Sequence, residues 1–147
     1  MKKIFIAIVL FVSCNTQPKN MSSEAADEII EADKAMNDLA TKEGFYKALL
    51  LYADDSVVKP QENEMPVIGK TNLEKYWAGR PDTKDITWFP FKAEAAASGD
   101  LGYSFGNWEY VSKDTTMYGF YYTIWKKQAD GKWKFIADGG NNTPKPQ

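Results

Sequence analysis

The second half of this chain contains four apolar segments that are separated from one another by short turn-forming stretches. Turn residues fill positions 98–100, 113–116 and 129–132, and the last stretch includes Asp130-Gly131, a favoured hairpin dipeptide. Connections this short join antiparallel neighbours in a sheet. We therefore expect a four-stranded antiparallel meander made of residues 85–97, 101–112, 117–128 and 132–141.

Pro90 falls inside the first of these strands. Proline has no backbone N–H group, so it cannot donate to a neighbouring strand and is confined to sheet edges and bulges. The first strand is therefore predicted to lie at an edge of the sheet or to bulge near Pro90.

The first half of the chain predicts helices. One helix is expected to start near Ser22-Ser23, because the acidic residues that follow suit the positive end of a helix dipole. Apolar residues recur in it every three or four positions and form one stripe that faces the protein core: Ile29, Ala32, Met36 and Leu39. Gly44 should break the chain before a second helix that ends at Asp54-Asp55.

Two short extended pieces, 56–59 and 65–68, are expected next. Thr71 and Glu74 have the spacing of a capping box, so a third, short helix is predicted to start there. It is expected to bury Leu73, Tyr76 and Trp77. Helices followed by an antiparallel meander indicate an α+β domain in which a strongly curved sheet wraps around the long helix.

The N-terminal residues have the pattern of an export signal. Two lysines precede an unbroken apolar run at 4–12, which is far shorter than the roughly 20 residues of a membrane-spanning helix. Residues 11–14, Phe-Val-Ser-Cys, resemble a bacterial lipobox, which implies lipidation of Cys14. The alternative is an ordinary signal peptide with a chance cysteine.

The predicted organisation is a signal peptide at 1–13, a lipidated cysteine and tether at 14–21, a domain at 22–141 and a flexible tail at 142–147. This organisation places the protein on a lipid anchor in the bacterial cell envelope. Asn15 follows the cysteine where an inner-membrane retention signal would have aspartate, so an outer-membrane anchor is favoured over an inner-membrane one.

Charge and composition exclude several kinds of function. Removal of Lys2 and Lys3 with the signal peptide changes the formal charge from −2 to −4, and an acidic domain does not favour nucleic acid. The chain has no histidine, which excludes Ser-His-Asp and Cys-His catalysis and the main zinc ligand. The acidic pairs at 54–55 and 62–64 lack calcium-loop spacing. No metal and no cofactor are expected.

Several segments resemble one known family in the right order. Residues 43–58, the segment 67–77 that starts Val-Ile-Gly-Lys and ends Tyr-Trp, and the hairpin segments 98–103 and 123–136 are similar to the SnoaL-like and DUF4440 branch of the nuclear transport factor 2-like superfamily. The resemblance spans residues 22–141. It implies a cone-shaped α+β fold with an apolar pocket at its open end, and homodimers are common in that superfamily.

Isomerases and cyclases of that superfamily use a buried carboxylate as a proton shuttle. The candidates in this chain are Asp138 and Asp55, with Glu94 and Glu109 as weaker ones. For Asp138 the opposing interpretation is a carboxylate that faces water, because strand alternation puts Phe135 on one face and Asp138 on the other unless a bulge intervenes.

Aromatic residues are the other candidate site, since they make up 14% of the chain. Rings in an apolar wall can each supply a single hydrogen bond to a ligand. The opposing interpretation is that the rings fill the core and a dimer face. The candidate ligand-binding residues are Tyr52, Trp77, Trp88, Tyr103, Trp108 and Tyr122, and Tyr76 and Trp125 belong to the wider set.

The sequence favours a lipid-anchored binding domain that holds a small apolar or amphipathic molecule without covalent chemistry. One alternative is an isomerase or cyclase in which Asp138 or Asp55 moves a proton and Tyr103 or Tyr122 donates a hydrogen bond. The other is an interaction or dimerisation module that has no ligand. The exposed rings of Trp108 and the pair Tyr121-Tyr122 favour a homodimer in any of these cases.

Overall fold

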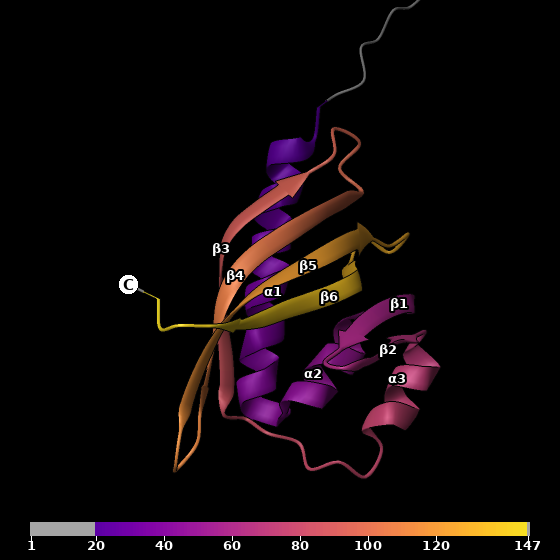
Figure 1. Ribbon diagram of the computed structural model, residues 1–147. Coiled ribbons are helices and arrows are strands. Elements are labelled where there is room, and N and C mark those ends of the chain that lie inside the picture. The colour runs from indigo at the N-terminus through magenta and orange to yellow at the C-terminus, as the bar shows by residue number, and fades with distance from the viewer. Residues whose placement is uncertain (1–19, 147) are drawn as a thin grey trace, which may run out of the picture.

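The computed structural model describes residues 20–146, so the predicted signal peptide, lipobox and Cys14 lie outside the described residues. Figure 1 shows the described part as helices packed inside a curved sheet. In chain order the elements are α1 (Ser22–Glu43), α2 (Phe45–Tyr52), β1 (Ala53–Gln61), β2 (Glu64–Ile68), α3 (Lys70–Trp77), β3 (Ile86–Ala95), β4 (Leu101–Val111), β5 (Thr116–Lys127) and β6 (Trp133–Thr143). The expected α+β architecture is confirmed.

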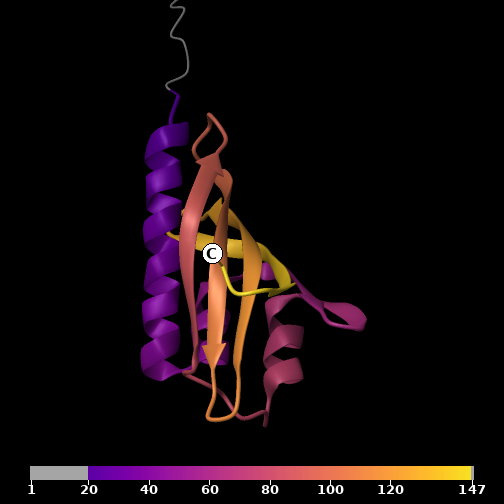
Figure 2. The same cartoon turned by 60° about the vertical axis from the view of Figure 1, so that its left-hand side comes forward.

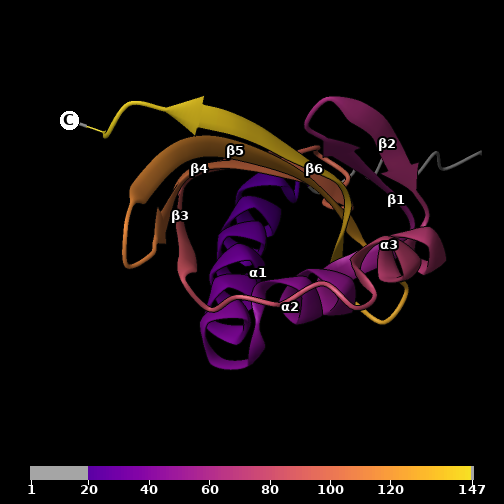
Figure 3. The same cartoon turned by 60° about the horizontal axis from the view of Figure 1, so that its bottom comes forward.

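The sheet is open and mixed, with strand order β2-β1-β6-β5-β4-β3. The predicted meander is confirmed for β3 to β6, in which every neighbouring pair is antiparallel. The sequence did not predict the pairings of β1: it is antiparallel to β2 and parallel to β6, with Ala53 opposite Phe135. The sheet bends around α1, which lies along its concave inner face (Figures 2 and 3).

Helix α1 contacts the sheet through a stripe at helical spacing. Its buried residues are Ala25, Ile29, Asp33, Met36 and Ala40. The predicted break at Gly44 is confirmed, because this residue has φ of 119° and a Cβ atom there would lie 2.3 Å from a carboxylate oxygen of Asp82. The same carboxylate accepts the backbone N–H groups of Tyr46 and Lys47 and so caps α2.

Two local predictions were wrong. Helix α2 ends at Tyr52, so Asp54 and Asp55 lie in β1 and do not end the helix. Helix α3 starts after Gly69, whose φ is 86°, and no side chain caps it, so Thr71 lies inside the helix and the predicted capping box is absent. A glycine with positive φ sets the turn there, and this geometry overrode the side-chain signal.

Two bulges in the meander bear on the predictions. β3 is the edge strand, and its register with β4 shifts between Pro90 and Lys92, so both parts of the prediction for Pro90 are confirmed. In β6, Phe135 pairs with Trp125 but Ala137 pairs with Ile124, which leaves Ile136 as the extra residue. This second bulge determines which way the later residues of β6 face.

The core lies between α1 and the inner face of the sheet, where Ile29, Trp125 and Phe135 have no exposed surface. β6 continues to Thr143, so two residues assigned to the tail pair with β5. None of the helices within residues 20–146 has the length and apolar character that crossing a membrane requires.

Candidate functional site

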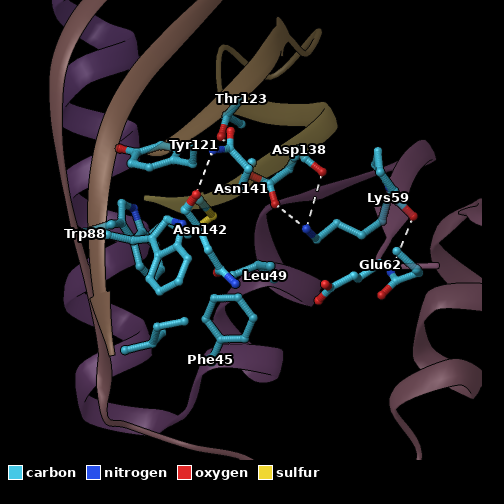
Figure 4. A pocket seen from close by; sticks show the side chains of 17 residues that line it. Phe45, Leu49, Lys59, Glu62, Trp88, Tyr121, Thr123, Asp138, Asn141 and Asn142 are labelled. Carbon is cyan, nitrogen blue, oxygen red and sulfur yellow. Dashed lines mark hydrogen bonds and ion pairs between the residues drawn. The ribbon is translucent and has the colours of Figure 1, made fainter. Parts of the chain in front are cut away.

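A cavity of about 510 Å³ opens between the C-terminal part of α1, helix α2 and the inner face of the sheet. Its floor is apolar, and its rim carries charged and amide side chains (Figure 4). The lining residues are Met36, Phe45, Leu49, Lys59, Pro60, Gln61, Glu62, Ile86, Trp88, Trp108, Tyr121, Thr123, Asp138, Gly139, Gly140, Asn141 and Asn142. A volume of this size accommodates a small organic molecule.

Four aromatic rings line this cavity: Phe45, Trp88, Trp108 and Tyr121. Phe45 meets Trp88 edge to face, with ring centroids 6.0 Å apart. The three rings on the sheet, those of Trp88, Trp108 and Tyr121, are called the aromatic wall below. Trp88 and Tyr121 are buried, and Trp108 is half-buried.

Glycines in the sheet make room for this wall. A Cβ atom at Gly119 would lie 2.0 Å from the Trp108 ring, and one at Gly106 would lie 2.3 Å from the Tyr121 ring. Gly119 is paired with Trp108, and Gly106 is paired with Tyr121. Each ring therefore covers its cross-strand glycine, which is why two large rings fit against a continuous sheet.

The rim holds an ion pair. Lys59 Nζ lies 2.8 Å from Asp138 Oδ2 and 3.3 Å from the Asp138 carbonyl oxygen, and Thr123 Oγ1 donates to Asp138 Oδ1 at 2.9 Å. The Lys59 and Asp138 side chains are 16% and 14% exposed. The parallel pairing of β1 with β6 brings the two residues together. Both carboxylate oxygens of Asp138 therefore have a partner.

The bulge at Ile136 decides the orientation of Asp138. After the bulge, Asp138 pairs with Thr123 and faces the cavity. The expectation that Asp138 lies on the face opposite Phe135 was wrong, and its stated exception, an intervening bulge, is what the structure contains. Figure 4 shows Asp138 pointing toward Lys59 at the right of the cavity.

The remaining polar rim is made of amides and one further carboxylate. Asn141 donates to the backbone oxygen of Asn142 at 3.0 Å, and Gln61 donates to that of Lys59 at 3.3 Å. Glu62 is exposed at the mouth, and within residues 20–146 it forms no ion pair. This rim can form hydrogen bonds with a polar group of a ligand.

Behind the aromatic wall lies Asp33 of α1, which is fully buried. Its Oδ1 accepts from Trp88 Nε1 at 2.7 Å, and its Oδ2 accepts from Ser104 Oγ at 2.6 Å and from Tyr121 Oη at 3.0 Å. Trp125 Nε1 donates to Ser104 Oγ at 2.9 Å, so the Ser104 proton is free to point at Asp33. Two residues of the aromatic wall are thus fixed by one carboxylate.

The Asp33 carboxylate has only neutral partners. No lysine or arginine in residues 20–146 pairs with it. Burial raises the pKa of Asp33 above its ordinary value, although the three hydrogen bonds oppose that shift. The pKa of Tyr121 is also raised, first by burial and then by the nearby Asp33 charge.

Sequence reasoning missed both Asp33 and Tyr121 as site residues. A signal for Asp33 was present, because it lies four residues after Ile29 and three before Met36, inside the apolar stripe of α1. An aspartate in such a stripe must be hydrogen-bonded in the core. Tyr121 was grouped with Tyr122, and only the register of β5 separates them.

The predicted aromatic residues are divided among several places. Trp88 and Trp108 line the cavity. Tyr52 lines a second, more open groove beside α1 and packs edge to face on Trp125. Trp77 stacks on Tyr46, with ring centroids 4.8 Å apart. Tyr103 and Tyr122 have the opposite strand parity to Tyr121 and lie on the convex outer face, so they do not contribute to this cavity.

The other predicted carboxylates also lie away from the cavity. Asp55 is exposed on β1, and Glu109 pairs with Tyr118 on the outer face. Glu94 is exposed, forms an ion pair with Lys92 at 2.9 Å and accepts from Tyr103 Oη at 2.5 Å. Of the four predicted carboxylates, Asp138 alone lines the cavity. Residues 20–146 contain no cluster of three or more side chains suited to hold a metal ion.

No protein-family model matches the sequence, and comparison with curated proteins found no match either. Solved structures do match. A ketosteroid isomerase-like protein from Erwinia carotovora atroseptica SCRI1043 is 17% identical, with a TM-score of 0.65 over 82% of this chain and 98% of that one. An NTF2-like protein of unknown function from Pseudomonas putida KT2440 is 16% identical, with a TM-score of 0.65 over 82% and 87%. The S. rosetta CaMKII hub is 16% identical, with a TM-score of 0.59 over 80% and 96%.

Identities this low establish the fold alone, because one fold supports many activities. The chain has the curved α+β architecture of nuclear transport factor 2-like proteins, as the resemblance implied.

Proposed function

We propose that this protein is a lipid-anchored envelope protein of the SnoaL-like and DUF4440 branch that binds a small amphipathic molecule in the cavity. The apolar part of the ligand packs on the aromatic wall, and its polar group bonds to the rim at Lys59, Asn141 or Asn142. The observation that carries the proposal is the cavity itself: about 510 Å³, with an apolar floor and a polar rim.

The contacts of the Asp138 carboxylate favour ligand binding over catalysis. A base that removes a proton needs an oxygen directed at the substrate. One oxygen of Asp138 is paired with Lys59 and the other accepts from Thr123. These contacts hold the carboxylate as part of the rim and leave no oxygen of it without a partner.

The envelope location rests on the lipobox-like residues that end at Cys14. The geometry of α1 is compatible with an anchor at that end. The helix starts at Ser22, just after the predicted tether, and Met36 in the cavity lies about 21 Å farther along its axis at 1.5 Å per residue. The cavity is thus displaced from the attachment point, so a ligand can enter while the protein is anchored.

The test is native mass spectrometry of the full chain as the cell produces it, released from membranes in mild detergent. We expect a small molecule to remain bound to the wild-type protein and to be lost from Trp108→Ala. The matched control is Tyr122→Ala, which removes an aromatic ring from the outer face and should retain the molecule. Wild-type protein that carries no molecule, even after incubation with an envelope lipid extract, would overturn the proposal.

An isomerase-type activity is the second candidate, because Asp138 faces the cavity and one structural relative is called ketosteroid isomerase-like. In that case the Lys59 pair opens on substrate binding and frees Oδ2. The test is exchange of α-protons into deuterated water for bound ketones. Exchange that Asp138→Asn abolishes would establish the enzyme, and exchange at the uncatalysed rate would eliminate it.

We also propose that two copies pair through the outer face of the sheet. Phe89 and Phe91 are 64% and 60% exposed there, and Tyr122 is 38% exposed. Lys92 lies beside Glu94, so a two-fold arrangement can place unlike charges opposite each other. Light scattering should give a dimer mass that Phe91→Glu reduces to a monomer, and a wild-type monomer at high concentration would rule the pairing out.

A further inference from the structure

We infer that the ligand of this cavity is an organic cation, with its charged nitrogen held against the aromatic wall of Trp88, Trp108 and Tyr121. The inference rests on the proposed function and adds the chemical class of the ligand. It follows from two features of the charges around the cavity and from the kind of surface that the wall presents.

The first feature is the balance of charge in the lining. Among residues 20–146, Lys59 is the only cationic residue that lines the cavity, against the two carboxylates of Asp138 and Glu62. Asp138 neutralises Lys59 through contacts at 2.8 and 3.3 Å, from its carboxylate and from its carbonyl oxygen. Glu62 is left without a cationic partner in residues 20–146. The mouth of the cavity is therefore negative overall.

The second feature is the Asp33 carboxylate behind the wall. Its carboxyl group is fully buried, and its three donors are neutral groups of Trp88, Ser104 and Tyr121. A positive charge placed nearby favours the ionised form of such a carboxyl group, because the interior screens charge poorly. Two of these donors, Trp88 and Tyr121, line the cavity, so a cation held against them lies on the other side of the rings that bond to Asp33.

The wall itself suits a cation. The faces of aromatic rings carry negative charge, and tryptophan is the best partner for an ammonium group. Trp88 and Tyr121 donate hydrogen bonds to a carboxylate, and hydrogen-bonded groups polarise one another in an interior of low dielectric constant. Their rings are therefore more negative than rings whose polar hydrogens bond to water.

An anionic ligand fits poorly. It would have to compete with Asp138 for Lys59 and would approach Glu62 at the mouth. A neutral ligand of the same shape fits the space but gains nothing from Asp33 or Glu62. The structure thus predicts the order cation, neutral molecule, anion for ligands of equal size.

The test uses three probes that share one shape. They are (3-hydroxyphenyl)trimethylammonium, 3-tert-butylphenol and 3-tert-butylbenzoate. Binding to the full chain in lipid nanodiscs is measured by calorimetry at pH 7.5, with empty nanodiscs as the blank. We expect the cation to bind at least tenfold more tightly than the neutral phenol and the benzoate to bind most weakly.

Asp33→Asn tests the origin of the preference. The asparagine keeps the acceptor for Trp88, and its amide can donate to the hydroxyl groups of Ser104 and Tyr121, so the fold should be retained. We expect the preference for the cation to shrink severalfold while the affinity for the phenol stays the same. Glu94→Gln, which removes a carboxylate from the outer face, is the matched control and should leave the preference intact.

Trp108→Leu is a second, independent test, because Trp108 is not among the hydrogen-bond donors to Asp33. It should reduce the affinity for the cation more than that for the phenol. Equal or tighter binding of the phenol or the benzoate to the wild type would overturn the inference and leave the proposed function standing. Failure of all three probes to bind would overturn both.

Discussion

The two faces of the sheet use the same kinds of residue for opposite purposes. On the inner face, Tyr121 is buried, donates to Asp33 and lines the cavity, whereas Tyr122, the next residue, is exposed on the outer face. Asp33, behind the inner face, is enclosed by hydrogen bonds from neutral groups, whereas Glu94 on the outer face forms an ion pair at the surface. One position of strand register thus decides whether a residue belongs to the site or to the outer surface.

The largest difference between the faces should appear when a ring is removed from each. Trp125 on the inner face is fully buried and donates to Ser104. Trp125→Ala should cost about 4 kcal/mol of unfolding free energy, because it leaves a cavity and removes the hydrogen bond that Ser104 Oγ accepts. Tyr122→Ala on the outer face should cost about 1 kcal/mol. Urea denaturation at low protein concentration measures both, and equal costs would contradict the distinction between the faces.

A smaller difference is expected when a methyl group is added to glycines on the two faces. In Gly106→Ala the new Cβ would lie 2.5 Å from the Phe89 carbonyl oxygen and 2.3 Å from the Tyr121 ring. This change should cost about 3 kcal/mol. In Gly139→Ala the nearest atom is Tyr122 Oη at 2.8 Å, the end of a side chain that can rotate away, so the cost should stay below about 1 kcal/mol. Thermal melts of the two variants provide the comparison.

The pH dependence of stability should separate the faces further. The pKa of Asp33 is raised in the folded protein, so the folded state keeps a proton that the unfolded chain has lost above the ordinary value of 3.8. This contribution of Asp33 to stability is therefore present below that value and is lost as the pH rises through the raised pKa. Asp33→Asn should gain stability relative to the wild type as the pH rises above 3.8, as measured by urea midpoints. A constant difference would show that the Asp33 pKa is not raised.

The smallest effect is expected for Glu94→Gln. The pKa of Glu94 is lowered by its bonds to Tyr103 and Lys92, but both partners lie at the surface where water screens the charge. We expect no measurable change in the urea midpoint at pH 7 in monomeric protein. A clear loss of stability would mean that the outer face is covered under those conditions.

The sequence located most helices and strands, but it did not show which face of the sheet individual residues occupy. Turn residues located β3 to β6, and the missing N–H group of Pro90 located the edge and its bulge. Trp88 and Trp108, two of the proposed ligand-binding residues, line the cavity, but the sequence did not distinguish Tyr121 from Tyr122. The orientation of Asp138 depends on the bulge at Ile136, and the apolar residues 135–137 contain no glycine or proline that would have predicted a bulge.

Tertiary contacts explain the remaining errors. Asp33 could be recognised as buried from its place in the stripe of α1, but its partners come from β3, β4 and β5, which only the folded chain brings together. Lys59 had no signal in the sequence, since its position next to Asp138 comes from the parallel pairing of β1 with β6.

That parallel pairing also bears on when the protein becomes functional. It joins residues near the start of the domain to residues near its end, as Val58 opposite Ala137 shows. During synthesis, no partly emerged chain can close the rim, and a product truncated before Trp133 would present an open aromatic surface to chaperones and proteases. If the protein binds a ligand as proposed, only finished molecules will capture it.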